Sequence, residues 1–189
     1  MPIRGRPGWI TRLLLVLFVA AAGRASFAVA ATVSVDVDQR ADAVVIHAST
    51  RLTSDAATAW RVLTDYDRYA DFIPGVMSSR VVDRHGPTVL VEQSEELALW
   101  LLRLPLHVTY VIHEFPPNRV QSRATADALP ALESGYMITP MASGVRLDYV
   151  GRIGRGWLLL AGIEQTALRL GVVRQFTALA DEIERRSAN

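Results

Sequence analysis

Residues 56–76, AATAWRVLTDYDRYADFIPGV, decide the fold because several local signals within them agree on one shape. Ser54 or Asp55 can cap a helix at its start. Apolar residues then recur at helical spacing, at Ala57, Trp60 and Leu63. The first half of this stretch therefore predicts a short amphipathic helix.

The second half of the stretch carries another helix start. Asp65 is a good N-cap residue, and an apolar face follows it at Tyr66, Tyr69, Phe72 and Ile73. Pro74 and Gly75 then end this helix and turn the chain into a strand. We expect two short helices in a V, with Asp65 as a cap and with Asp67 and Asp71 in solvent.

These residues resemble the signature of the SRPBCC superfamily. The resemblance rests on WRVLTDYD at residues 60–67, followed by Tyr69, Phe72, the PGV of residues 74–76 and the SRV of residues 79–81. A later patch, GYMITP at residues 135–140 with Gly144 and Tyr149, is similar to the Gly-x-aromatic segment of that family. Tyr136 stands there where Trp is common. Within the superfamily the chain looks like the polyketide cyclase/dehydrase branch, which includes coenzyme Q-binding proteins and is related to START lipid-transfer domains.

Residues 1–30 read as a secretory signal peptide. Arg4, Arg6 and Arg12 give a basic start, residues 13–23 form an apolar run, and Ala28, Val29 and Ala30 make an A-x-A cleavage site. A retained membrane anchor would need about 20 apolar residues, and this run has about half that length. We expect export, cleavage after Ala30 and a periplasmic mature protein.

The charge of the chain changes when this segment is removed. The whole chain carries +1, but 20 cationic residues less Arg4, Arg6, Arg12 and Arg24 leave 16 against 19 acidic residues, or −3. No basic stripe with interleaved aromatic residues is present, which argues against nucleic acid as a partner. The chain has no Cys, which excludes disulfides and thiolate chemistry. Residues 31–189 fit one domain of common size.

Alternating apolar and polar residues predict a series of antiparallel strands. The first pair follows Val33, Val35 and Val37 and then Val44, Ile46 and Ala48, and it reads as a hairpin. After the two helices come strand-length runs separated by turn residues, at residues 77–83, 89–99, 104–114, 119–128, 134–141 and 145–153.

One face of these strands is expected to point inward. On the strand predicted over residues 104–114, one face carries Leu104, Leu106, Val108, Tyr110 and Ile112. On the strand predicted over residues 145–153, one face carries Val145, Leu147 and Tyr149. On residues 119–128 the inward face is small, with Ser122, Ala124 and Ala126, and small inward residues leave room for a ligand.

The last element is a long amphipathic helix over residues 158–186. Its apolar face steps by three or four residues, at Leu168, Val172, Phe176, Leu179 and Ile183. Gly162 and Gly171 interrupt it, and each costs about 1 kcal/mol against Ala. We expect close packing contacts at both glycines.

The resemblance supplies how these elements are wrapped. It implies an α+β helix-grip fold, in which a curved antiparallel sheet closes around the C-terminal helix and encloses an apolar cavity. We expect the ligand-binding residues of this cavity to be Tyr110, Ser122, Ala124, Tyr136, Tyr149 and Phe176. Tyrosines suit such a wall because each offers an apolar ring and one orienting hydroxyl group.

Catalytic and metal-binding patterns are weak. Known nucleophile, zinc and phosphate-loop motifs are absent, and His107 and His113 stand six residues apart on the polar strand face. No metal and no cofactor is predicted. Among Glu92, Glu95 and Glu96, alternation places at least one carboxylate near the interior, where it could serve a cyclase or dehydratase. The simpler interpretation is a strand end in solvent.

The sequence therefore predicts an exported protein that binds a hydrophobic small molecule, such as a lipid, quinone or polyketide, as a carrier or chaperone. One alternative is a cyclase or dehydratase that acts in the same cavity. Another is a cell-envelope factor with a vestigial cavity that binds a protein. Residues 100–102, WLL, could form an apolar rim that contacts a membrane transiently, or a buried turn. The ligand and the oligomeric state stay open.

Overall fold

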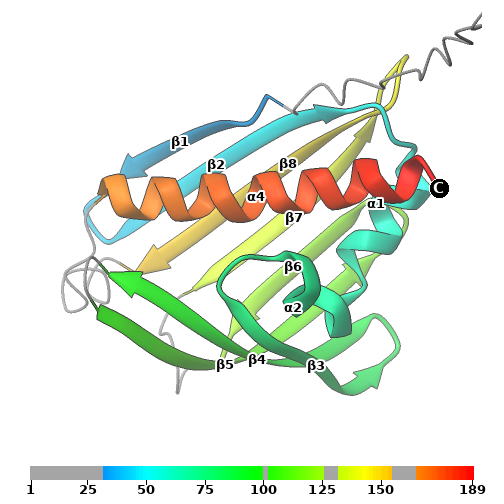
Figure 1. Cartoon of the computed structure of the whole chain (residues 1–189). Helices are drawn as coiled ribbons and strands as arrows, with labels where there is room; N and C mark the ends of the chain where they lie inside the picture. The colour runs from blue at the N-terminus through cyan, green and yellow to red at the C-terminus, as the bar shows by residue number, and fades with distance from the viewer. Residues whose placement is uncertain (1–31, 100–101, 126–131, 155–164) are drawn as a thin grey trace, which may run out of the picture.

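One curved antiparallel sheet of eight strands wraps around a long helix (Figure 1). The structure, a computed structural model, describes residues 32–99, 102–125, 132–154 and 165–189. Its strands are β1 (Ser34–Gln39), β2 (Ala43–Leu52), β3 (Val76–His85), β4 (Thr88–Leu99), β5 (Leu102–Phe115), β6 (Arg119–Ala124), β7 (Glu133–Pro140) and β8 (Val145–Gly154). The predicted helix-grip fold is thereby confirmed.

The strands follow the order β1-β2-β8-β7-β6-β5-β4-β3, so β1 and β3 form the two edges of the sheet. The first hairpin pairs with the last strand, as in Ile46 opposite Gly151, while β3 to β8 form a meander. The pairing of β3 with β4 is irregular at two points, between Val76 and Ser78 and between Val81 and Asp83. The strand predicted over residues 119–128 ends at Ala124, and residues 126–131 lie outside the described residues.

Helix α1 (Ala56–Leu63) starts as the sequence predicts. The carboxylate of Asp55 accepts hydrogen bonds from the backbone N–H of Thr58, at 2.8 Å, and from its hydroxyl, at 2.9 Å. A cap of this kind stabilises a helix by about 1 kcal/mol. The buried face of α1 consists of Thr58, Ala59, Val62 and Leu63, so the predicted stripe is correct at Leu63 but wrong at Ala57, which is exposed.

The second arm of the V differs from the prediction. It consists of a 3-10 turn, η1 (Tyr66–Arg68), and a single helical turn, α2 (Tyr69–Phe72). Asp65 precedes η1 but makes no side-chain cap, because its carboxylate instead accepts a hydrogen bond from Arg186 at 2.6 Å.

The two following aspartates, Asp67 and Asp71, are exposed to solvent as expected, and each also has a hydrogen-bond partner. The carboxylate of Asp67 accepts a hydrogen bond from the backbone N–H of Val81 at 2.7 Å. Asp71 pairs with Arg68 at 2.7 Å, one helical turn away. Asp67 therefore joins η1 to the outer edge of β3.

Helix α4 (Gln165–Ser187) crosses the concave side of the sheet over β2, β8 and β7 (Figure 1). It buries Phe176, Leu179, Ala180 and Ile183, as its spacing predicts. The close packing expected at Gly171 is wrong, because an added Cβ there would meet no atom within 4 Å. Gly162 and the predicted first turns of this helix lie outside the described residues.

The core divides into two main clusters of buried side chains. The larger one joins α4 and α1 to β2, β7 and β8, and includes Ile46, Leu63, Ile138, Leu147 and Ile183. The smaller one lies under η1 and includes Tyr66, Val89, Val91, Ile112 and Val120. Trp60 packs against both clusters, so α1 links them. The inward faces predicted for β5 and β8 are confirmed by the burial of Val108, Ile112, Val145 and Leu147.

Candidate ligand-binding site

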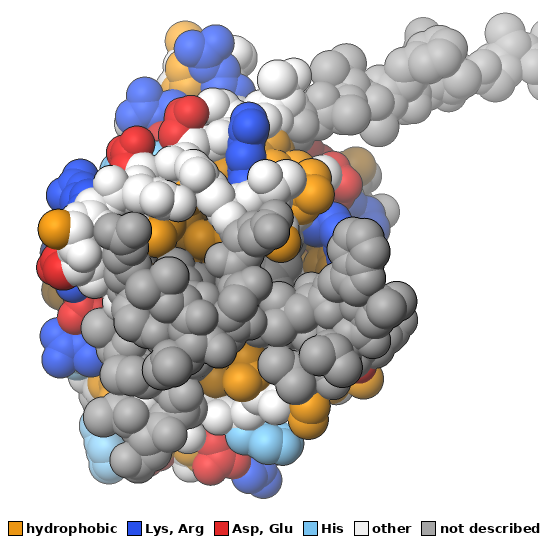
Figure 2. Space-filling model, turned by 90° about the vertical axis from the view of Figure 1, so that its left-hand side faces the viewer, with side chains coloured by type: hydrophobic (Ala, Val, Ile, Leu, Met, Phe, Trp, Pro, Cys, Tyr) orange, Lys and Arg blue, Asp and Glu red, His pale blue; other side chains and the backbone are white. Residues whose placement is uncertain are grey.

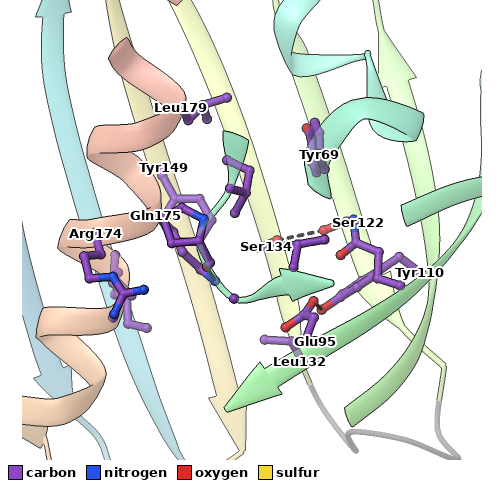
Figure 3. Close-up of a pocket in the computed structure, with 18 of the residues that line it drawn as sticks. Tyr69, Glu95, Tyr110, Ser122, Leu132, Ser134, Tyr149, Arg174, Gln175 and Leu179 are labelled. Atoms are coloured by element: carbon purple, nitrogen blue, oxygen red, sulfur yellow. Dashed lines mark hydrogen bonds between the residues drawn. The ribbon is translucent and has the colours of Figure 1, made fainter. Parts of the chain in front are cut away.

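A cavity of about 520 Å³ lies between the sheet and α4. Figure 3 shows its walls, with Arg174, Gln175 and Leu179 on α4 facing side chains that come from the strands. Apolar side chains from both core clusters line it, including Ile46, Ile112, Val120, Leu168 and Leu179. The volume falls in the range of about 300 to 1,000 Å³ that is usual for small-molecule sites.

Two tyrosines and a phenylalanine form an aromatic group on one side of this cavity. Tyr136 on β7 lies directly opposite Tyr149 on β8, and their ring centroids are 4.9 Å apart. The ring of Phe176 on α4 is nearly parallel to that of Tyr136 at 6.5 Å. Because Phe176 is buried behind the two tyrosines, it holds their rings against the sheet.

A chain of hydroxyl groups crosses the wall beside these rings. Ser122 and Ser134 occupy paired positions on β6 and β7 and share a hydrogen bond of 2.7 Å (Figure 3). Ser134 also hydrogen-bonds the phenol of Tyr149. Burial raises the pKa of Tyr149 to about 12, and the hydrogen bond with Ser134 partly offsets this, so the phenol stays neutral. Gly151 leaves space for this phenol, since a Cβ there would lie 2.6 Å from its oxygen.

Glu95 on β4 places a carboxyl group in the cavity wall (Figure 3). The hydroxyl of Tyr110 on β5 donates a hydrogen bond to its Oε1 atom at 3.0 Å. Burial raises the pKa of Glu95 above its ordinary value, and the hydrogen bond from Tyr110 works in the opposite direction. Burial and the neighbouring Glu95 charge likewise raise the pKa of Tyr110.

This position corrects the simpler expectation for the three glutamates. Glu92 is exposed on the outer face of β4 and pairs with Arg80 at 3.0 Å, but Glu95 does not lie in solvent. Glu96 also borders the cavity, next to Gly75, whose carbonyl accepts a hydrogen bond from the Glu96 N–H at 2.7 Å. Glu92 and Glu96 lie on the opposite face of β4 from Glu95, because the pairing of β4 with β5 has no register shift between these residues.

Four of the six predicted site residues lie in the cavity wall, namely Tyr110, Ser122, Tyr136 and Tyr149. Ala124 does not, because it is buried in a small cluster with Val108, against which Tyr110 and Leu132 pack. Phe176 lies behind the tyrosines, in the larger core cluster. That any of these residues binds a ligand stays a prediction.

Sequence reasoning missed several wall residues that come from turns and helices. Tyr69 lines the cavity, and its hydroxyl donates to the carbonyl oxygen of Leu63 at 2.7 Å. Gln175 on α4 donates through Nε2 to the carbonyl oxygen of Pro74 at 3.2 Å, which joins α4 to the turn before β3. The sequence shows the apolar stripe of Tyr66, Tyr69 and Phe72, but it does not indicate whether these side chains face the core or a cavity.

The end of the molecule at which α4 begins is shown in Figure 2. Hydrophobic side chains are visible at several points around the middle of this face, and most of the charged side chains lie toward its margin. Leu170 on α4 is exposed to 61%, and Arg174 borders the cavity one turn further along the helix. The apolar rim predicted at residues 100–102 falls on side chains outside the described part of the chain.

His107 and His113, both on β5, lie on the outer surface. Nδ1 of His107 is 2.8 Å from the hydroxyl of Ser94, and Nδ1 of His113 is 3.1 Å from that of Thr88. The described residues contain no cluster of three or more His, Asp or Glu side chains that could hold a metal ion. Within the same residues, no helix combines the length and the apolar character needed to cross a membrane.

The sheet, the long helix and the largely apolar cavity between them define a START-like fold. The model of the family "Polyketide cyclase / dehydrase and lipid transport" matches residues 43–188. The chain belongs to this family, which implies a hydrophobic small molecule as its ligand. No curated protein sequence matches the chain significantly.

Solved structures share the fold at low sequence identity. The aromatase/cyclase ZhuI from Streptomyces sp. R1128 superposes with a TM-score of 0.63 at 15% identity, covering 77% of this chain and 94% of that one. A STAR-related lipid transfer protein from Xanthomonas axonopodis gives 0.54 at 14% identity, with 82% and 98% covered. A START superfamily protein from Mycobacterium smegmatis gives 0.56 at 12% identity, with 78% and 97% covered.

Proposed function

We propose that this protein is an exported carrier or chaperone, which binds a hydrophobic small molecule in its cavity and does not transform it. The observation that carries the proposal is the cavity of about 520 Å³ within the fold. Protein cores are normally packed as densely as organic crystals, with few voids larger than a water molecule. A volume of this size therefore points to an occupant, such as a lipid, a quinone or a polyketide-like compound.

The lining supports an apolar ligand with a few oxygen atoms. Most of the wall is aliphatic or aromatic, and its polar groups include the Ser122, Ser134 and Tyr149 hydroxyls and the Glu95 and Tyr110 pair. A few convergent polar groups on an apolar wall are what orients a ligand in sites of this kind. The same volume argues against the envelope factor with a vestigial cavity.

Export rests on residues 1–30, which carry the features of a signal peptide. A carrier in the periplasm would move its ligand between membranes or protect it from water, and a transient membrane contact belongs to that role. The proposal needs no cofactor, metal or nucleic acid.

A substitution that fills the cavity tests this function. We expect Ser122→Phe to exclude the ligand, because the ring enters the cavity from the middle of its wall. Gln121→Phe is the matched control, since the neighbouring residue on β6 is exposed on the outer face of the sheet. Mass spectrometry of organic extracts from protein purified from its native compartment should find a ligand with the wild type and Gln121→Phe, and not with Ser122→Phe.

Circular dichroism and the melting temperature should show that all three proteins are folded. Extracts of the wild type without any bound hydrophobic compound, or an unchanged amount of ligand in folded Ser122→Phe, would refute the carrier function.

Glu95 favours a second candidate function, a cyclase or dehydratase that acts in the same cavity. A carboxyl group with a raised pKa next to a phenol can transfer protons to and from a substrate. If the protein is an enzyme, Glu95→Gln should lower turnover of a polyketide substrate by about 100-fold or more. A carrier with the same substitution should keep its native ligand.

A further inference from the structure

The charge inside the cavity is unbalanced at Glu95. Among the described residues that line the cavity, Arg174 is the one cation, and it lies on an exposed part of α4. The pKa of Glu95 responds to burial and to the hydrogen bond from Tyr110, with no contribution from an arginine. An acid that has no cation partner among the described residues disfavours a second negative charge beside it in an apolar cavity.

The hydrogen bonds of this pair leave one group unused. Tyr110 donates to Oε1 of Glu95, and its donor capacity is thereby taken. Within the described part of the chain, no hydrogen bond reaches the other carboxyl oxygen of Glu95, Oε2, so this oxygen can meet a ligand. As a carboxylate this oxygen accepts a hydrogen bond, and as a neutral acid it donates one. A hydroxyl group on the ligand can satisfy both states, since it donates and accepts, whereas a carbonyl oxygen can satisfy only the neutral acid.

We propose that Glu95 and Tyr110 form the recognition point of the cavity, which selects uncharged ligands that carry a hydroxyl group over anionic ligands such as fatty acids. This inference rests on the proposed binding function and names the class of ligand. The hydroxyls of Ser122, Ser134 and Tyr149 bond to one another, so they form a separate neutral surface. That surface discriminates weakly between charged and uncharged ligands.

Three compounds with the same alkyl tail test the selection, namely 1-decanol, decanoate and decylamine. Isothermal titration calorimetry near neutral to mildly alkaline pH, where decanoate is ionised, measures the affinity of the wild type for each. We expect 1-decanol to bind at least about tenfold more tightly than decanoate, because its hydroxyl group can donate a hydrogen bond to the Glu95 carboxylate. A hydrogen bond to a charged group contributes a difference in affinity of about this size.

Two variants locate the effect. Glu95→Gln keeps the shape of the side chain and removes its charge, so decanoate should bind more tightly to this variant. The preference for 1-decanol over decanoate should then fall below about threefold, which is the range over which the contribution of a single hydrogen bond varies. Glu92→Gln is the matched control on the same strand, because Glu92 lies on the outer face with Arg80. This control should keep the preference of the wild type.

The outcomes separate this inference from the function on which it rests. Equal binding of 1-decanol and decanoate by the wild type overturns the selection and leaves hydrophobic ligand binding in place. Tighter binding of decylamine than of 1-decanol shows a cation site and also overturns it. A preference that survives in Glu95→Gln assigns selection to other residues. If none of the three compounds binds, the carrier function fails, and the inference fails with it. The comparison of 1-decanol with decanoate needs only the wild-type protein, so it tests the selection even if a variant does not fold.

Discussion

At Gly144 the backbone has a φ of +82°, and an added Cβ would lie 1.9 Å from the carbonyl oxygen of Leu52. A side chain at this position would therefore need a strained backbone and would also push β2 away from β8. Such local strain costs about 1 to 3 kcal/mol before the clash is counted.

We expect Gly144→Ala to lower the free energy of unfolding by at least about 2 kcal/mol, because strain and clash act together. Gly171→Ala is the opposite case, since nothing lies within 4 Å of an added Cβ and the residue sits in α4. That variant should gain about 0.5 to 1 kcal/mol through helix propensity. Urea denaturation of both variants measures the difference, and a neutral Gly144→Ala would contradict the strain at the turn.

Single side chains also mark where sequence reasoning succeeded and where it could not. Tyr110 and Tyr149 were placed in the wall by strand alternation alone. For Glu95 the available signal was strand alternation, because residues 89, 91 and 95 fall on the same face of β4. Val89 and Val91 are fully buried, so this face is the inner one. Ala124 also lies on the inner face of its strand, but neighbouring side chains cover it. Alternation does not show whether an inward-facing residue reaches the cavity.

Among the elements, α4 is fixed at its C-terminal end by a group of charged side chains. Arg186 bonds Asp65 and Glu182 at 2.6 Å each, and Arg185 bonds Glu182 at 2.6 Å. The hydrogen bond from Arg185 is the largest of the effects that lower the pKa of Glu182 to about 2, and the bond from Arg186 adds to it. This group of charged side chains joins the last turns of α4 to the start of η1.

We expect Glu182→Gln to lower the free energy of unfolding at neutral pH by about 1 to 3 kcal/mol, because hydrogen bonds to a charged group are lost. A carboxyl group with a lowered pKa in the folded state stabilises the fold above its ordinary pKa of 4.5. That stabilisation is lost as the pH falls toward about 2. The difference between wild type and variant should therefore shrink over this interval.

Urea denaturation at a series of pH values measures this difference. Asp181→Asn, at an exposed position on the same helix, is the control and should show no comparable change with pH. A constant difference between wild type and Glu182→Gln across the interval would contradict the role of the ion pairs. The sequence did not predict this group, because Asp65 and Arg186 lie 121 residues apart and Asp65 resembled a helix cap.

For the whole molecule, the location of the protein depends on its first 30 residues, which lie outside the described part of the chain. We expect the mature protein to begin at or near Ala31, because the A-x-A motif ends at Ala30. N-terminal sequencing of protein from the periplasmic fraction measures this. Full-length protein that keeps Met1 in the cytoplasm would contradict export, and with it the negative charge of the mature chain.

The fold as a whole was predictable because alternation and helical spacing report which side of an element is buried. The wrapping of the sheet came from the family resemblance, since periodicity does not say which strands pair. The cavity could be expected from small inward residues such as Ser122, but its extent could not, because it depends on how α4 and the turn at Pro74 pack against the sheet.

The two irregularities in β3 bear on how the protein behaves when it is concentrated. An edge strand with regular spacing offers a continuous row of backbone groups to which a second molecule can add its own strand. In β3 that row is broken near Met77 and again near Val82, two exposed apolar residues, and the N–H of Val81 between them is occupied by Asp67. The most apolar part of the open edge is therefore also the part least able to seed aggregation.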